Sequence, residues 1–269
     1  MHFTNKIFFI KAPDVPHPND VSAWPLHGQA GTSPRFSRPT PELILEAGYP
    51  VETHSVVTED GYILSLHRIP VYTRSGGPRA PVFLQHGLLS SSADWAVTGP
   101  AHGLAFQLSD AGYDVWMGNF RGNTYSKGHI KSDISDKEYW VREGADDILC
   151  DHDHVQTFTW DEHAEYDLPA MLGHVMKVTG AEEYHYIGHS MGTLAYFTAC
   201  NYNAWVCDKS RLMVGYGPHT AVPHLTSPLF RLLALFSSDI HWLLEHIGLY
   251  QFAPSNWLTR ALADQVCDR

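Results

Sequence analysis

The stretch YHYIGHSMGTLAYF, residues 184–197, decides the fold of this chain. Its first four residues form an apolar run that predicts a strand, and the residues after Gly192 predict a helix. Ser190 lies between them in a Gly-x-Ser-x-Gly sequence, the pattern of a nucleophile elbow, which exposes a serine hydroxyl at a sharp turn. Gly188 and Gly192 are expected because the backbone at such a corner passes close to its neighbours. The alternative is a glycine-rich turn that contains a serine by chance.

The composition of the chain limits the class of protein. The 269 residues are 44% hydrophobic and 12% aromatic, which is enough for a sizeable core in one domain. The formal net charge of −11 argues against nucleic-acid binding, because phosphate contacts need a basic surface. The same charge offers no electrostatic attraction to a membrane surface.

Other segments predict the rest of a sheet and its helices. Residues 56–57 and 62–66 flank Glu59-Asp60-Gly61, which predicts a β-hairpin with glycine available for a positive φ. A helix is expected from residue 168, with Pro169 in its first turn and Gly180 past its end. The remaining expected elements are strands at 81–85, 113–117 and 212–216 and a helix at 101–109. Because strands alternate with helices, the predicted class is α/β with a mostly parallel sheet.

The loop after the strand at 81–85 supplies a second part of a catalytic site. Acyl transfer needs two backbone N–H groups to stabilise an oxyanion, from the residue after the nucleophile and from an earlier strand-ending loop. Met191 follows Ser190, and Leu88 lies in the loop His86-Gly87-Leu88-Leu89. We therefore expect the amides of Leu88 and Met191 to form the oxyanion hole. A plain strand-ending turn is the alternative interpretation of His86-Gly87.

Six further segments occur in one order along the chain. They are VTEDGYIL (57–64), FLQHGLL (83–89), AGYDVWMGN (111–119), RGNTYS (121–126), WDE (160–162) and YDLPA (166–170). Together with the elbow they resemble the acid lipase family, the gastric and lysosomal acid lipases and their invertebrate relatives, over roughly residues 41–269. The resemblance implies an α/β-hydrolase fold that cleaves acyl esters of glycerol or sterols, with Ser190 as nucleophile. It implies no cofactor and no metal ion.

The resemblance also divides the chain into three parts. Residues 1–40, rich in Pro, Ser, Gly and His from residue 12, are expected to be an irregular or disordered leader. Residues 41–220 are expected to be the N-terminal part of the hydrolase core, and residues 221–269 a partial helical cap. An apolar stretch of this cap, residues 229–250, offers contact with a lipid interface, or else packs as a helix onto the core.

The catalytic triad is expected to be incomplete. In this fold the acid and the histidine follow the serine on later strands. His219 comes too early to be the family's base, and His241 and His246 lie in the apolar cap region. The triad Asp and His are therefore expected to be absent from this chain, which leaves Ser190 without a residue to accept its proton.

Residues 141–156, VREGADDILCDHDHVQ, have no counterpart in the family pattern. Removing them joins residues 137–140 to residues 157–162 in continuous family sequence. We interpret the segment as a retained in-frame intron. A metal site at Asp151-His152-Asp153-His154 is the alternative, but adjacent ligands in one loop give poor coordination geometry.

The cysteines and terminal segments carry weaker signals. Cys200 and Cys207 are expected to pack as small apolar groups, and Cys267 matches a family cysteine whose partner would lie past Arg269. No apolar run has the length of a signal-peptide core or of a transmembrane helix, so a secreted or lysosomal location rests on the resemblance alone.

Two classes of function remain for this sequence. One is a serine ester hydrolase of lipid metabolism that acts on a lipid ester. The other is a non-catalytic lipase-like protein that keeps the fold to bind lipid or a partner. Peptide or amide cleavage on the same fold is disfavoured by the acid-lipase motifs.

Overall fold

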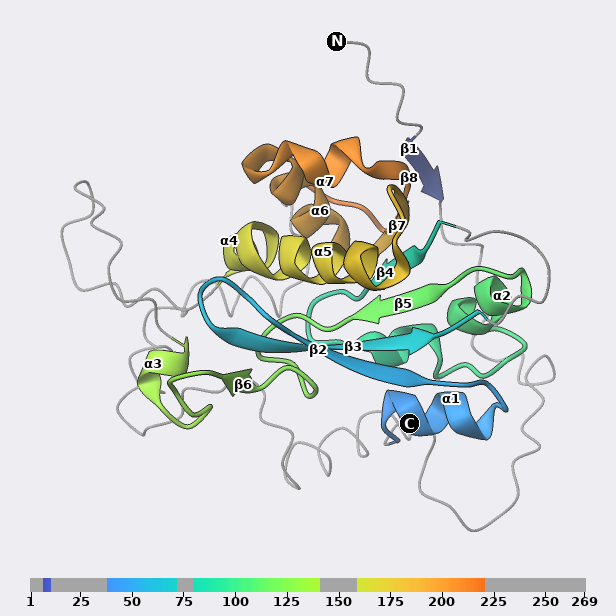
Figure 1. Ribbon diagram of the computed structural model, residues 1–269, viewed down its shortest axis with the longest axis horizontal. Coiled ribbons are helices and arrows are strands. Elements are labelled where there is room, and N and C mark those ends of the chain that lie inside the picture. The colour runs from blue at the N-terminus through green and yellow to red at the C-terminus, as the bar shows by residue number, and fades with distance from the viewer. Residues whose placement is uncertain (1–6, 11–37, 72–79, 141–158, 221–269) are drawn as a thin grey trace, which may run out of the picture.

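The computed structural model describes residues 7–10, 38–71, 80–140 and 159–220 (Figure 1). Eight of the described segments join in one twisted sheet. In spatial order they are β1 (Ile7–Ile10), β8 (Ser210–Tyr216), β7 (Tyr184–His189), β4 (Val82–Gln85), β5 (Val115–Gly118), β3 (Tyr62–Ile69) and β2 (Glu52–Val57), with β6 (Gly128–His129) also paired to β3. The pairings from β1 to β5 are parallel, and those of β3 with β5, β2 and β6 are antiparallel. This is the mostly parallel α/β sheet that the sequence predicts.

The helices cover both faces of this sheet. They are α1 (Thr40–Glu46), α2 (Leu104–Asp110), α3 (Lys137–Trp140), α4 (Trp160–Glu162), α5 (Leu168–Thr179), α6 (Met191–Tyr202) and α7 (Ala204–Asp208), with a 3-10 turn at Ser92–Trp95 and a π-helical turn at His163–Asp167. Figure 1 shows α5, α6 and α7 on one side of the sheet and α1 and α2 on the other. β4 and β5 are buried along their whole length, because parallel strands at the centre of such a sheet are covered on both faces.

Two apolar cores lie on the two faces. One packs α5 and α6 on the sheet and includes Met171, Val175 and Phe83. The other packs α1 and α2 on the opposite face and includes Ile44 and Phe106. All five of these side chains are essentially inaccessible to solvent, so the two cores fix the layers that hold the strand ends in place.

The local predictions for the hairpin and for the long helix are confirmed. β2 and β3 pair in register around a turn in which Gly61 has φ +100°, a conformation that favours glycine. The helix α5 begins at Leu168 with Pro169 in its first turn and ends at Gly180, whose φ of +67° is the left-handed cap.

Three features differ from the predictions or lie outside the described residues. Residues 7–10, inside the expected irregular leader, form a strand parallel to β8. Cys200 and Cys207 are joined by a disulfide, so the expectation that they only pack as apolar groups is wrong; the short link between α6 and α7 brings their Cα atoms to 5.3 Å. The expected insert at 141–156 and the expected cap at 221–269 lie outside the described residues. Within the described chain, every helix is too short or too polar to cross a bilayer.

Candidate active site

Ser190 stands at the corner between β7 and α6, and its backbone is strained. Its φ of 49° and ψ of −114° lie in a region that side-chain-bearing residues avoid. Leu89, with φ 56°, is the other non-glycine residue with a positive φ in the described part of the chain. The Ser190 amide donates to the carbonyl oxygen of Tyr216 at 2.9 Å, which ties the corner to the neighbouring strand. Strain that costs about 1–3 kcal/mol is thus held at the predicted nucleophile and in the predicted oxyanion loop.

Gly188 and Gly192 are required by space. A Cβ on Gly192 would lie 2.6 Å from the carbonyl oxygen of Gln85 and 2.9 Å from that of His86. A Cβ on Gly188 would lie 2.9 Å from the carbonyl carbon of Gly192. These neighbours are backbone atoms that cannot rotate away. The first turn of α6 therefore packs directly on the end of β4, and a larger residue at either position would have to displace the backbone.

The loop after β4 lies against this elbow. A Cβ on Gly87 would come within 3.0 Å of His189 Nδ1 and 3.2 Å of Ser190 Cβ. Among the described residues the Leu88 amide has no hydrogen-bond acceptor. The Met191 amide is the first N–H group of α6, and N–H groups in the first turn of a helix have no acceptor within the helix. The structure thus places the two predicted oxyanion donors on adjoining segments beside Ser190.

His86 is a buried, neutral imidazole beneath this loop. Its Nε2 lies 3.2 Å from the Phe120 amide, which can only donate, so Nε2 is the acceptor. Nδ1 therefore carries the proton and donates to the carbonyl oxygen of Gly87 at 2.8 Å. Burial lowers the pKa of His86 to about 4. Because both ring nitrogens are engaged, His86 holds the loop in shape and is not free to take a proton from Ser190.

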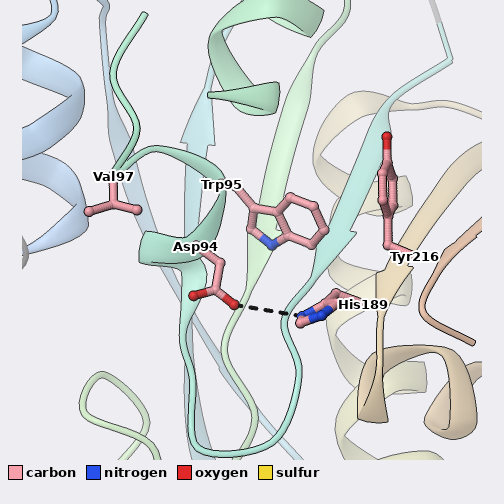
Figure 2. Close-up of a pocket in the computed structure, with 5 residues that line it drawn as sticks. All are labelled: Asp94, Trp95, Val97, His189 and Tyr216. Atoms are coloured by element: carbon pink, nitrogen blue, oxygen red, sulfur yellow. Dashed lines mark ion pairs between the residues drawn. The ribbon is translucent and has the colours of Figure 1, made fainter. Parts of the chain in front are cut away.

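A cavity of about 330 Å³ opens beside the elbow (Figure 2). It is lined by Asp94, Trp95, Val97, His189 and Tyr216. The rings of Trp95 and Tyr216 meet edge to face with centroids 6.4 Å apart, and His189 Nδ1 lies 4.0 Å from Asp94 Oδ2. The cavity thus combines aromatic walls with one polar pair next to the serine. The cavity could not be predicted from the sequence, because its residues come from three separate segments of the chain that share no common spacing.

The candidate bases for Ser190 fall into two groups. Among the described residues, which include His219, no histidine forms a hydrogen bond with the Ser190 hydroxyl. His241 and His246 lie outside the described residues, as does the possible ligand cluster at residues 151–154. The absence of the triad Asp and His from this chain stays a prediction.

Known proteins match the chain at the segments that build this site. A family model described as the partial α/β-hydrolase lipase region matches residues 40–99. A second, described as the α/β hydrolase fold, matches residues 80–208. The first match includes the loop at Leu88, and the second includes both that loop and the elbow.

The chain is also similar to lipases of other organisms. It is 37% identical over 241 residues to lipase member K of Mus musculus, covering 88% of this chain and 56% of that one. It is 37% identical to gastric triacylglycerol lipase of Mus musculus, covering 91% and 58%. It is 35% identical to the lysosomal acid lipase/cholesteryl ester hydrolase of Homo sapiens, covering 91% and 59%. The chain thus spans little more than half the length of these relatives.

Proposed function

This chain belongs to the acid lipase family of α/β hydrolases, and we propose that it is a lipid ester hydrolase with Ser190 as its nucleophile. The observation that carries the proposal is the strained backbone of Ser190, a conformation with no structural benefit to the residue itself. Its side chain makes no capping bond to α6. Strain of this kind persists where the position of a reacting group requires it.

The chemistry follows from the surroundings of Ser190. The hydroxyl oxygen attacks the ester carbonyl carbon, and the carbonyl oxygen becomes an oxyanion as the tetrahedral intermediate forms. The amides of Leu88 and Met191 donate to this oxygen, and the N-terminus of the twelve-residue helix α6 adds a favourable dipole. The alcohol then leaves, and water releases the fatty acid from the acyl-enzyme. None of the described residues is assigned as the acceptor of the Ser190 proton.

The surroundings of the serine suit an apolar substrate. Leu88 and Leu89 are 61% and 67% exposed on the loop beside it, and the cavity carries the rings of Trp95 and Tyr216. Relatives named for triacylglycerol and cholesteryl ester hydrolysis support a lipid ester as substrate. A secreted or lysosomal location is supported by the name of the lysosomal relative and by the Cys200–Cys207 disulfide, since such bonds persist in oxidising compartments. Contact with a lipid interface through residues 229–250 is part of the same proposal.

Hydrolysis of p-nitrophenyl esters, from acetate to decanoate, tests the proposal. The proposal predicts that the wild type hydrolyses the longer esters, that Ser190→Ala loses this activity, and that Ser109→Ala on α2 keeps it. That result would also show that the expected absence of the triad acid and base is wrong. Binding of a fatty acyl ligand with no hydrolysis that depends on Ser190 would overturn the proposal in favour of a non-catalytic lipid-binding protein.

A further inference from the structure

The segment Asn119–Ser126, which joins β5 to β6, makes buried contacts with both ends of the oxyanion loop, residues 86–92. At the first end, the side-chain amide nitrogen of Asn123 lies 3.2 Å from Nε2 of His86, beside the bond from the Phe120 amide. The amides of Tyr125 and Ser126 donate to Asn123 Oδ1 at 2.9 and 3.1 Å. Since those two amides can only donate, the NH₂ group of Asn123 must face His86 and donates to it.

The second end of the oxyanion loop is held by Asn119. The backbone amide of Ser92 donates to Asn119 Oδ1 at 2.9 Å, and Asn123 Nδ2 donates to the same oxygen at 2.9 Å. One NH₂ group, that of Asn123, therefore links the histidine at one end of the loop to the asparagine that binds the other end. No other element among the described residues joins both ends in this way.

The two asparagines are themselves fixed to the body of the protein. Asn119 is fully buried, and its Nδ2 donates to the carbonyl oxygen of Ser65 on β3 at 3.0 Å. The next residue but one, Arg121, donates from its backbone amide and from Nε to the buried carboxylate of Asp167, at 3.0 and 2.8 Å. The segment is thus anchored on the sheet and on the start of α5, and it gives the oxyanion loop a rigid support.

The oxyanion loop needs such support because its conformation is unfavourable. Leu89 has φ 56° and is 67% exposed as a residue, so burial of its own side chain contributes little to offset the strain. A loop with fixed ends keeps this conformation, whereas a loop with one free end relaxes. We propose that Asn119 and Asn123 are positioning residues that clamp residues 86–92 and so aim the Leu88 amide at the developing oxyanion. This inference rests on the proposed function of Ser190.

The variant Asn123→Asp tests the clamp with little change in shape. A carboxylate keeps the oxygen that accepts from Tyr125 and Ser126 but cannot donate to His86 or Asn119. Asn203→Asp, between α6 and α7, is the matched control with the same change of charge. Asn123→Ser, which adds no charge, serves if the aspartate variant does not fold.

Two readouts separate the clamp from the proposed function. The first is amide hydrogen exchange of Ser92 and Phe120, whose amides donate to Asn119 Oδ1 and His86 Nε2 at the two ends of the loop; it should become at least ten times faster in the Asn123 variants while α5 exchanges as in the wild type. The second is ester hydrolysis, where kcat should fall about 10- to 100-fold with KM unchanged, since small misplacements of a catalytic group cost about this much. Unchanged exchange, or unchanged kcat in a protein whose hydrolysis depends on Ser190, would overturn the clamp. If Ser190→Ala does not lose hydrolysis, the proposed function fails, and the exchange result alone then decides whether Asn119 and Asn123 clamp the loop.

Discussion

Replacing Ser190 by glycine should stabilise the protein while it removes the nucleophile. The backbone of Ser190, at φ 49° and ψ −114°, is one that glycine adopts without a steric penalty. The comparison is with Ser190→Ala, which also lacks the hydroxyl but keeps the Cβ and therefore the strain. Ser190 makes no side-chain cap to α6, so neither variant loses a capping bond.

The expected difference follows from two opposing terms. Relief of the strained conformation contributes about 1–3 kcal/mol. The greater freedom of glycine in the unfolded chain costs about 0.4–1 kcal/mol. The middle values leave Ser190→Gly more stable than Ser190→Ala by about 1 kcal/mol, which for a chain of this size raises Tm by about 2–4 °C.

Calorimetry and urea unfolding of the two variants measure this difference. Ser109 in the helix α2 supplies the control, because there the order should reverse and glycine should be less stable than alanine by about 0.8–1.0 kcal/mol. A Ser190→Gly variant no more stable than Ser190→Ala would refute the argument that strain is stored at the elbow.

Three further predictions concern the packing, charge and titration of the core. Gly192→Ala should cost about 1–3 kcal/mol by overpacking, because its Cβ would lie 2.6 Å from the carbonyl oxygen of Gln85; an unchanged urea midpoint would show that β4 yields freely. Asp167→Asn should cost about 3–5 kcal/mol in thermal unfolding, because it removes the buried carboxylate that pairs with Arg121, and a loss below 1 kcal/mol would contradict this. Burial lowers the pKa of His67 to about 4, below its unfolded value near 6.5, so its contribution is complete above pH 6.5 and is lost as the pH falls from 6.5 to 4. His67→Gln should flatten the pH dependence of the free energy of unfolding in that window by an amount on the order of 3 kcal/mol, whereas parallel profiles would exclude the effect.

The elements with strong local signals could be predicted from the sequence. The elbow at Ser190 and the hairpin at Gly61 follow from glycines beside short apolar runs, and α5 follows from helical spacing between Pro169 and Gly180. In each case the residues that determine the structure are close together in the sequence, in the same element or in the next one. Local chemistry is then sufficient.

Features made by distant segments could not be predicted. The strand Ile7–Ile10 is an apolar run of four residues, too short to assign by itself, and its place in the sheet comes from pairing with β8, some two hundred residues further along the chain. The Cys200–Cys207 disulfide depends on the turn between two helices, which the spacing of the cysteines alone does not reveal. In the candidate site, too, the residues could be predicted from local motifs, but the contacts between distant segments could not. His86 was found in its motif, but its link to Asn123 exists only once the sheet brings the two loops together.

Covalent labelling tests the central claim, that Ser190 is a nucleophile in a preformed oxyanion site, most directly. The protein is treated with a long-chain alkyl p-nitrophenyl phosphonate, and the modified residue is located by peptide mass spectrometry. The amides of Leu88 and Met191 would stabilise the charge that develops on the phosphoryl oxygen of the reagent, so the reaction at Ser190 is favoured over that at other serines. One adduct is expected, on Ser190, and it should be lost in Ser190→Ala and kept in Ser109→Ala. Labelling spread over several serines, or unchanged in Ser190→Ala, would contradict the central claim.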